Sequence, residues 1–499
     1  MSHLKLWEFY CLRKAFRMDN IKKEIVSGVF FTALAKYANL VISLVVTAVL
    51  ARLLAPDQFG VVAIATVAIA FLNLIADFGL SPAVIQHKEL DRKALGYLFS
   101  LSVYIAITLS ILFFLSAEII GKWYAQPQLK PICQLLALSL FFSGITVVPN
   151  ALFFRDRLFK SIALRSLIVQ IIGGCLSIIA AFKGMGVYAL ILNPIFSSLL
   201  IFIISYLKYP LKFSLHFSFQ PLRPLFSYSI FQFLFNIINY FSRNSDTLLI
   251  GKYLGMVPLG FYDKSYRLMS LPLQNITQVI TPVIHPILSL KGKDNGYLYE
   301  ANLKLTSLLS LIGFPLSVFL FYSAEELILL FFGPQWGLAI PSFKILSLTV
   351  GIQLILSSSG SIFQTAGDTK SLFICGLFSA VLNVAGILFG VFYAKSIDAV
   401  AMCLLVTFSV NFVQAYWLMY RVVFRRSMVG FFNSLWRPIL FTILLGGVFH
   451  LLISYYLPDT LAFRLVLKTG IYLFSMILMI WFGGYRSLLL AFLRKSSIQ

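Results

Sequence analysis

Seven charged residues lie inside long apolar stretches of this chain, where an ionisable side chain is costly and normally faces a protein or water interior. They comprise four cations and three anions, so they predict a polar cavity with a net positive charge. Such a cavity would suit an anionic substrate. The seven residues are Lys36, Asp77, Arg243, Asp246, Asp263, Lys264 and Arg267.

The spacing of these charges also permits a purely structural interpretation. Arg243 and Asp246 are three residues apart, and Asp263 and Arg267 are four apart, so each pair would share one helix face and neutralise itself. Lys264, at the end of its apolar stretch, could extend its ammonium group to the interface. Lys36 lies in mid-stretch without a nearby acid, which makes it the strongest candidate for a substrate contact.

Three asparagines accompany the charges and add hydrogen-bonding groups to the same segments. Asn39 lies three residues after Lys36, whereas Asn236 and Asn239 precede Arg243. Their amides could bind sugar hydroxyls in a polar cavity, or they could join neighbouring helices. The sequence leaves both interpretations open.

The elements that must position these residues are membrane-spanning helices. The composition is 60% hydrophobic and 12% charged, about half the charge of a soluble domain. A spanning helix needs about 20 apolar residues, and fourteen segments qualify. The predicted spans are 24–50, 58–80, 95–115, 132–152, 161–182, 186–207, 225–250, 257–287, 303–324, 339–362, 371–394, 397–419, 437–456 and 465–485.

The net charge of +22 indicates membrane orientation rather than nucleic-acid binding. With the N-terminus inside, the cytoplasmic segments carry about three times as many Lys and Arg residues as the opposite side, as the positive-inside rule requires. We therefore expect both termini in the cytoplasm. Residues 1–23 are basic and amphipathic without a cleavable signal, so we expect them to lie on the inner membrane surface.

A short motif occurs twice, at an offset of 200 residues. Residues 50–60 read LARLLAPDQFG and residues 250–260 read IGKYLGMVPLG, and each copy closes the first span of a six-span block. A repeat of an even number of spans predicts two lobes related by a pseudo-twofold axis along the membrane normal. The fold class is thus an all-α polytopic membrane protein with two six-helix lobes and two added helices.

The predicted organisation has four parts. The cytoplasmic basic segment 1–23 is followed by an N-lobe at 24–212 with spans 1–6 and a C-lobe at 213–422 with spans 7–12. Spans 13–14 and a cytoplasmic tail occupy 423–499.

Motifs for enzyme chemistry are absent from the sequence. It contains no GxxxxGK[ST] phosphate loop, no HExxH and no DxD, and its five cysteines form no CxxC pair. We expect no catalytic residues, no metal and no cofactor, so any transport would draw on an ion gradient, the membrane potential or a substrate gradient.

Three stretches resemble a known family. The sequence ARLLAPDQFG at 51–60 resembles the first-loop motif of polysaccharide transporters in the multidrug/oligosaccharidyl-lipid/polysaccharide flippase superfamily. DTLLIGKYLG at 246–255 resembles the equivalent second-lobe motif, and DFGL at 77–80 resembles the end of the second span. The resemblance covers essentially the whole chain and is greatest to exporters of colanic acid or lipopolysaccharide O-units.

The resemblance implies a flippase in the bacterial inner membrane. It would move an undecaprenyl-diphosphate-linked oligosaccharide to the periplasmic leaflet by alternating access, among membrane lipids and alongside other polysaccharide-assembly proteins. The cations that could line its cavity are Lys36, Arg243, Lys264 and Arg267, and the carboxylates that could couple transport to an ion are Asp246 and Asp77.

Two other classes of function remain open at this stage. A drug or cation antiporter of the same superfamily would need a net acidic cavity, which the charges here oppose. A membrane-embedded glycan polymerase or acyltransferase usually carries a large external loop, whereas no predicted loop exceeds roughly 20 residues, the length of one span.

Overall fold

The computed structural model describes residues 31–87, 89–214, 223–289, 294–455, 458–482 and 484. All regular structure in these ranges is helical. The basic segment 1–23 and the end of the tail lie outside the described residues.

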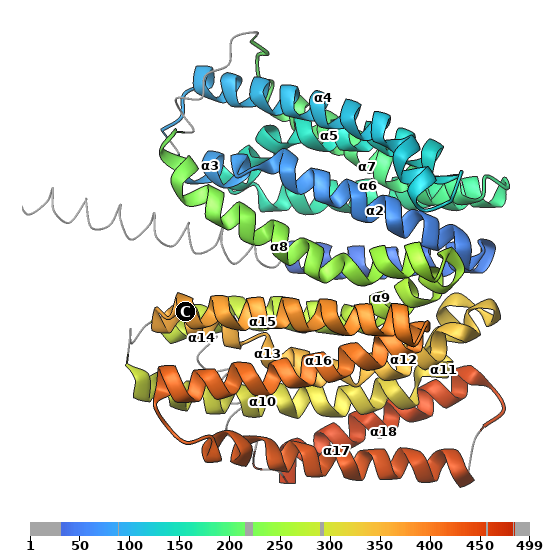
Figure 1. Ribbon diagram of the computed structural model, residues 1–499, viewed down its shortest axis with the longest axis vertical. Coiled ribbons are helices and arrows are strands. Elements are labelled where there is room, and N and C mark those ends of the chain that lie inside the picture. Colours follow the sequence, from blue (N-terminus) through green and yellow to red (C-terminus); the bar gives the residue numbers. More distant parts are fainter. Residues whose placement is uncertain are drawn as a thin grey trace, which may run out of the picture. The chain divides into compact units, whose positions relative to one another are not determined.

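A helix occupies each of the fourteen predicted spans (Figure 1). Eleven of the described helices are long and apolar enough to cross a membrane, and a bent pair makes twelve. The protein is therefore a multi-pass membrane protein, and the predicted all-α fold is confirmed. The first six spans are Phe31–Leu53, α2 (Pro56–Asp77), α4 (Arg92–Trp123), α5 (Leu129–Arg155), α6 (Phe159–Phe182) and α7 (Val187–Lys208), with the short α3 (Leu80–Gln86) between α2 and α4.

Two of the remaining helices, α8 and α9, are more polar than the first six spans. Helices α8 and α9 have 31 and 34 residues and carry most of the charges singled out above. The bounds are α8 (Arg223–Tyr253), α9 (Met256–Ser289), α10 (Asn295–Tyr322), α11 (Ala324–Phe332), η2 (Pro334–Ala339), α12 (Ile340–Ser347), α13 (Thr349–Leu356), α14 (Ser359–Ala366), α15 (Thr369–Leu388), η3 (Phe389–Tyr393), α16 (Ile397–Leu418), η4 (Met419–Phe424), α17 (Val429–Tyr455) and α18 (Leu461–Phe482).

Polar caps explain where several helices begin. Asp91 accepts a 2.7 Å hydrogen bond from the Ala94 amide at the start of α4, and Asp294 accepts bonds from the first turn of α10. Asp368 caps α15 in the same way. These side chains satisfy amide groups that a helix end leaves without partners.

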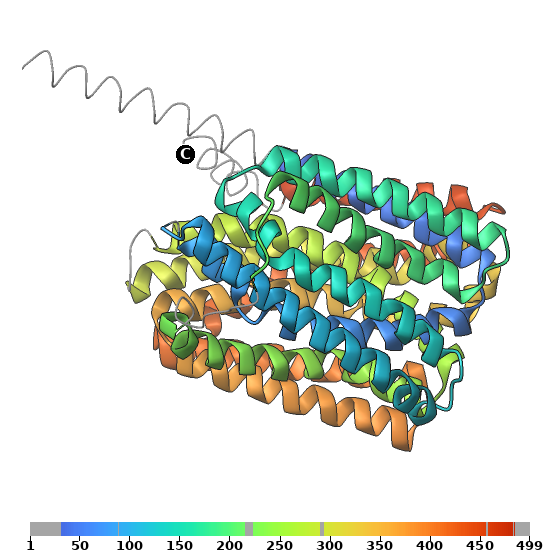
Figure 2. The same cartoon turned by 90° about the horizontal axis from the view of Figure 1, so that it is seen from above.

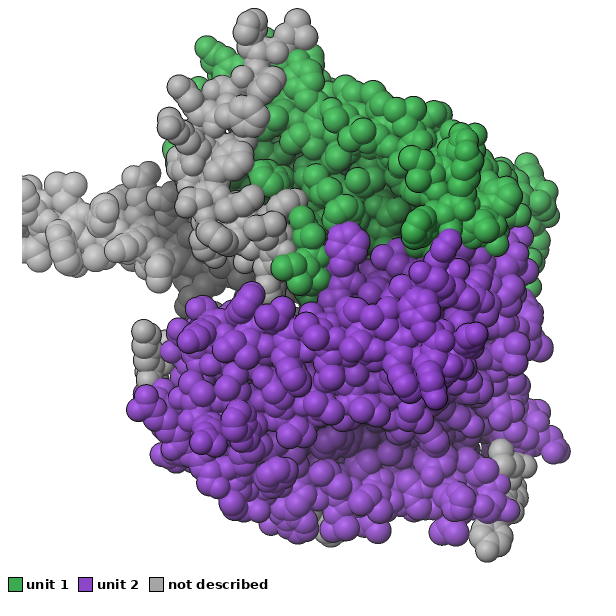
Figure 3. Space-filling model, in the orientation of Figure 1, with its two compact units in different colours: residues 1–54, 64–240 green, residues 55–63, 241–499 purple. Residues whose placement is uncertain are grey.

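The chain divides into two compact units (Figure 3). Unit 1 contains 1–54 and 64–240, and unit 2 contains 55–63 and 241–499. Two helices belong to both units: α2 starts in unit 2 and continues in unit 1, and α8 passes from unit 1 to unit 2 after Tyr240. The predicted division at 212/213 and 422/423 stays a prediction.

Unit 1 is built around α5. Helices α4 and α7 pack along α5, α6 packs on α7, and α3 closes one end (Figures 1 and 2). A cluster of buried aliphatic and aromatic side chains joins α3, α4 and α5, including Val84, Leu98 and Leu152. This packing gives the charged and amide groups of unit 1 a rigid frame.

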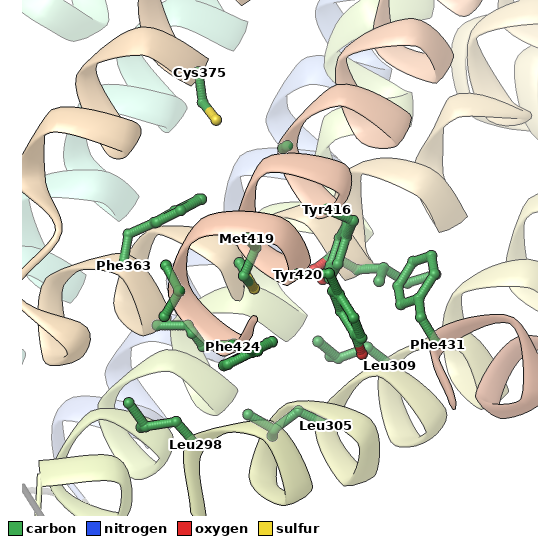
Figure 4. Close-up of a cluster of buried hydrophobic side chains, with 14 of the residues drawn as sticks. Leu298, Leu305, Leu309, Phe363, Cys375, Tyr416, Met419, Tyr420, Phe424 and Phe431 are labelled. Atoms are coloured by element: carbon green, nitrogen blue, oxygen red, sulfur yellow. The ribbon is translucent and has the colours of Figure 1, made fainter. Parts of the chain in front are cut away.

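Unit 2 has a larger aromatic core between α10, α13, α14, α16 and α17. Tyr416, Tyr420 and Phe431 lie together in Figure 4, and the rings of Tyr416 and Phe431 stack at 4.4 Å. The Tyr420 hydroxyl accepts a 3.0 Å hydrogen bond from the Asn302 amide, so its polar atom is satisfied within the core. Such offset aromatic stacking stabilises a core beyond the area it buries.

The tenth span is broken, which the apolar sequence did not predict. Segments 334–347 and 349–366 meet at a bend of 44°.

Two glycines bring the next pair of helices close together. A Cβ on Gly390 would lie 2.8 Å from the Cα of Val400, and one on Gly386 would lie 2.8 Å from Thr407. These two glycines therefore allow close packing against α16, as small residues do between membrane helices.

A buried ion pair fixes α18 to the rest of unit 2. Lys468 in α18 lies 2.6 Å from a carboxylate oxygen of Glu326 in α11 and donates a 2.7 Å hydrogen bond to the Tyr322 carbonyl. The Lys468 and Glu326 side chains are 4% and 2% exposed. Each charge therefore depends on the other for its solvation.

We predict that Glu326→Gln lowers the unfolding free energy by about 3–5 kcal/mol, because it leaves the Lys468 charge buried without an anion. The double variant Glu326→Leu/Lys468→Met should recover most of that loss. Thermal unfolding in detergent measures both effects. Glu118→Gln is the control, since Glu118 is half-exposed and its pairs with Lys122 and Lys130 lie at the surface; equal losses in Glu326→Gln and Glu118→Gln would contradict the prediction.

Candidate functional site

Lys36 lies in the second turn of helix Phe31–Leu53 in unit 1. Its side chain is half-buried and forms no hydrogen bond or ion pair within the described ranges. An ammonium group held in an apolar span without an internal partner is the feature expected of a ligand contact. The structure thus keeps Lys36 as a candidate.

Asn39 serves helix packing. Its amide donates a 3.0 Å hydrogen bond to the Ser166 hydroxyl of α6. Two turns further along, Val46 lies against Gly174 of the same helix, where an added Cβ would come within 2.6 Å. The side-chain oxygen of Asn39 (Oδ1) is buried and has no hydrogen-bond partner in the part of the chain that is described.

Helix α8 carries a polar stripe. Asn236, Asn239 and Arg243 follow one another at spacings of three and four residues, which places them along one face of the helix. Asn239 and Arg243 are exposed and Asn236 is half-buried. This stripe agrees with the arrangement that the sequence predicts for a polar cavity, although its role as a binding surface stays a prediction.

Asp246 does not pair with Arg243 in the described structure. Its carboxylate is buried, 4% exposed, and accepts hydrogen bonds from the Tyr262 hydroxyl and the Thr247 amide, both at 2.7 Å. Asp77, by contrast, accepts a 3.0 Å bond from the Ser81 amide, where the chain turns from α2 into α3. Asp246 is therefore the carboxylate with a neutral side-chain partner, whereas Asp77 has a local capping role.

Lys264 lies in a buried aromatic setting rather than on an open face. It is 2% exposed, and its ammonium lies 3.9 Å from the ring centre of Phe59 and 3.4 Å from a carboxylate oxygen of Asp263. Arg267 pairs with the same carboxylate at 3.0 Å and is itself exposed. The predicted Asp263–Arg267 pair therefore forms, and Lys264 obtains both an anion and a cation–π contact.

Sequence reasoning did not single out Arg165, which is 7% exposed. Its guanidinium donates to the Ser205 hydroxyl at 2.6 Å and to the Asn150 carbonyl oxygen at 2.7 Å, and it lies 4.7 Å from the Phe153 ring centre. It joins α5, α6 and α7. The signal that identified Lys36, a cation within an apolar stretch, would also have found Arg165.

The described ranges contain no group of three or more His, Cys, Asp or Glu residues able to hold a metal ion. The charges singled out instead fall into two classes. Most are bound to protein groups, while Lys36 and Arg243 form no hydrogen bond or ion pair in the described structure. Lys36 in unit 1 and Arg243 in unit 2 are thus each a candidate contact for an anion in a multi-pass membrane protein.

The chain belongs to the polysaccharide biosynthesis protein family, whose sequence profile matches residues 49–341. This confirms the resemblance seen in the sequence motifs.

Several named relatives align over most of both chains. The chain is 24% identical to the teichuronic acid biosynthesis protein TuaB of Bacillus subtilis, over 86% of this chain and 89% of that protein. It is 25% identical to the lipopolysaccharide biosynthesis protein WzxC of Escherichia coli, over 84% and 85%. It is also 25% identical to the succinoglycan biosynthesis transport protein ExoT of Rhizobium meliloti, over 87% of each.

Solved structures share the fold. The lipid II flippase MurJ, in an inward closed conformation, matches with a TM-score of 0.72 at 16% identity, covering 92% of this chain and 100% of that one. An inward-facing multidrug resistance MATE family transporter of the MOP superfamily matches with a TM-score of 0.57 at 16% identity, over 81% and 95%. The predicted fold class is that of these membrane proteins.

We predict that Arg243→Ala changes the unfolding free energy by less than about 0.5 kcal/mol, as at other exposed positions. Asp246→Ala should cost about 1–3 kcal/mol, because it leaves the buried Tyr262 hydroxyl without an acceptor. Unfolding in detergent of both single variants and the double variant measures the coupling. A coupling above about 1 kcal/mol would show an ion pair between the two side chains and contradict the geometry described here.

Proposed function

We propose that this protein is a flippase that carries a lipid-linked oligosaccharide, joined to undecaprenyl diphosphate, across the bacterial inner membrane by alternating access. The single observation that carries the proposal is that Lys36, in the candidate span Phe31–Leu53, and Arg243, in α8, are cations with no hydrogen bond or ion pair in the described structure. Family membership and the name of ExoT, a transport protein, support the same class of function.

The chemistry of the substrate explains why such cations are needed. A diphosphate that enters the membrane interior loses its hydration. The free-energy cost of this loss is prohibitive unless opposite charges replace the water. Lys36 would act as a point charge on a phosphate oxygen, and Arg243 can offer two parallel N–H groups to a phosphate. Asn236 and Asn239, on the same face of α8, would offer hydrogen bonds to sugar hydroxyls.

The sequence predicts four cations in the cavity, and we assign direct contact with the substrate to two of them. Lys264 and Arg267 are engaged by Asp263, so Lys36 and Arg243 are assigned the direct contact. Lys264 and Arg267 would then contribute through the positive potential around Asp263. Asn39, whose amide binds Ser166, would orient helix Phe31–Leu53 and with it Lys36.

We assign the coupling of transport to an ion to Asp246 rather than to Asp77. Asp246 is buried and held by the neutral Tyr262 hydroxyl, so gain or loss of a proton or a sodium ion would alter a contact between α8 and α9. Asp77 is occupied by its cap on α3. No enzymatic step is needed, which agrees with the name of ExoT, a transport protein.

The two alternative functions gain no support from the described site. An antiporter for organic cations would need exposed carboxylates, whereas Asp246 is buried and Asp263 is paired. A polymerase would need a large external loop, and the longest connection between consecutive helices, from α7 to α8, runs only from Lys208 to Arg223.

The proposed topology places both termini in the cytoplasm, with lobes at 24–212 and 213–422 and two added spans in 423–499. Single cysteines at Lys93 and Arg157 should resist a membrane-impermeant thiol reagent in intact cells. Cysteines at Gln128 and Asp459 should react. All four positions are exposed at helix ends or in turns, so the reverse pattern would invert the orientation and the direction of transport.

The central mutational prediction concerns the two open cations. Lys36→Ala and Arg243→Ala should each lower glycan export at least tenfold at normal protein level, because the diphosphate loses a counter-charge. Lys36→Arg should retain more export than Lys36→Ala, since it keeps the charge.

The measurement is accumulation of lipid-linked glycan on the inner leaflet of a deletion strain carrying each variant. Lys370→Ala is the matched control, because it removes one exposed cation from the first turn of α15. Full export by Lys36→Ala and Arg243→Ala would refute the assignment of these residues, and absence of any accumulated lipid-linked glycan in the deletion strain would refute the proposed function.

A further inference from the structure

A short turn joins two spanning helices of unit 2. The helices Ile397–Phe424 and Val429–Ser454 are both long and apolar enough to cross a membrane, so the turn between them lies at a membrane surface. Its first two residues are Arg425 and Arg426. Arg425 ends the helix in the left-handed conformation with a φ of 53°, and the Arg426 amide donates a 3.1 Å hydrogen bond to the Tyr420 carbonyl. The backbone thus holds two adjacent arginines at the interface.

This turn is the cationic part of a long stretch without acidic residues. Residues 399–458 contain no Asp or Glu, and their cations are the exposed Arg421, Arg425, Arg426 and Arg437. The side chains of Arg421, Arg425 and Arg426 form no hydrogen bond or ion pair in the described structure. A helix C-terminus offsets only about half an elementary charge. Most of the positive charge at the turn is therefore uncompensated within the described protein.

Aromatic rings hold two of these guanidinium groups by their flat faces. Arg421 lies 5.3 Å from the ring centre of Trp417, and Arg426 lies 4.6 Å from that of Tyr299. A stacked guanidinium keeps its N–H groups in its own plane, so its edge can still donate to an anion. Trp417 is 46% exposed, as is usual for Trp rings at a membrane–water interface.

A packed aromatic base supports the turn (Figure 4). The buried ring of Tyr420 lies 5.2 Å from Phe424 and 5.6 Å from Phe431. Tyr299, on which Arg426 stacks, packs against Phe424 at 5.7 Å. The arginines are therefore attached to a rigid core, and an anion that binds them has little backbone to order.

Exposed apolar side chains run from the turn along one face of α17. Val429, Phe432, Trp436 and Leu440 are spaced three, four and four residues apart, which places them on one stripe of the helix. In a multi-pass membrane protein such an exposed stripe faces lipid chains. A cationic turn that continues into an apolar stripe matches the two parts of a phospholipid, an anionic headgroup and its acyl chains.

We propose that this turn is a binding site for an anionic phospholipid of the surrounding membrane. The phosphodiester accepts N–H bonds from Arg421, Arg425 and Arg426, and an acyl chain lies along the α17 stripe that begins at Val429. A headgroup with a net negative charge, such as that of phosphatidylglycerol, is preferred over phosphatidylethanolamine, whose ammonium group would add a cation beside the arginines. The inference is independent of the transported substrate.

Native mass spectrometry of the purified protein tests the site with dioleoyl phosphatidylglycerol and dioleoyl phosphatidylethanolamine as probes. The native protein should bind phosphatidylglycerol at least fivefold more tightly. Each interfacial arginine contributes about a fivefold gain in affinity for an anionic lipid. The variant Arg425→Gln/Arg426→Gln should therefore bind phosphatidylglycerol at least tenfold more weakly, with little change for phosphatidylethanolamine and the same unfolding temperature in lipid-free detergent.

The matched control is Arg157→Gln/Lys160→Gln, at the turn between α5 and α6. Arg157 and Lys160 are exposed, Arg157 is also left-handed with a φ of 56°, and Lys160 lies 5.4 Å from the ring centre of Phe31. This turn contains the exposed Asp156, so an anionic lipid gains less there. The control should lower phosphatidylglycerol affinity less than twofold, and equal losses in the two double variants would overturn the proposal.

Photochemical cross-linking locates the lipid. With benzoylphenylalanine in place of Phe432, bilayers of equal phosphatidylglycerol and phosphatidylethanolamine content should give adducts at least fivefold enriched in phosphatidylglycerol. The same probe in place of the exposed Phe154, at the end of α5, should show no enrichment. Equal adducts of the two lipids at Phe432, or enrichment that survives Arg425→Gln/Arg426→Gln, would contradict a lipid site at this turn.

Two further measurements separate the lipid from other anions. Inorganic phosphate has the anionic oxygens without the acyl chains and should not displace phosphatidylglycerol; displacement would assign the turn to a free anion and overturn the lipid. The variant Lys36→Ala/Arg243→Ala should keep the native preference for phosphatidylglycerol. Loss of that preference would place the phospholipid at the cations assigned to the substrate instead of at this turn.

Discussion

The cost of holding a charge inside an apolar helical protein governs how this molecule is organised. Lys468 is matched by Glu326, Lys264 by Asp263 and the Phe59 ring, and Asp246 by the Tyr262 hydroxyl. Arg165 donates hydrogen bonds to neutral oxygens of Asn150 and Ser205. Each of these groups joins helices and stabilises the fold, because removing one partner would strand the other in a low-dielectric interior. Lys36 and Arg243, which form no such bond in the described ranges, stand apart from this pattern, and in our account an anionic substrate completes their solvation.

The second organising feature is duplication. The repeated motif produces the same helix–turn–helix unit twice, and its glycines allow the two copies to approach through their backbones. Because equivalent residues meet equivalent residues, a small movement of one copy changes both halves of the contact together.

The sequence predicts the fold well and the site only in part. Helices lie at the positions of all fourteen predicted spans, and eleven of them, or twelve with the bent pair, are long and apolar enough to cross a membrane. A run of about 20 apolar residues is a strong and local signal. The break in the tenth span was missed because the two segments together are long and apolar enough to be taken for one span. The burial of Lys264 was missed because Phe59 lies two hundred residues away, and Tyr262 could not be recognised as the partner of Asp246 from a separation of sixteen residues. Local pairs such as Asp263–Arg267 were predictable, while contacts between distant helices required the structure.

The most direct test of the account is a binding measurement on the purified protein with undecaprenyl diphosphate and, for comparison, uncharged undecaprenol, by native mass spectrometry. The account predicts that the diphosphate binds at least tenfold more tightly than undecaprenol, and that the double variant Lys36→Ala/Arg243→Ala loses this preference while unfolding at the same temperature. Equal binding of the two lipids by the native protein, or an undiminished preference in the double variant, would contradict the claim that these two cations receive the diphosphate.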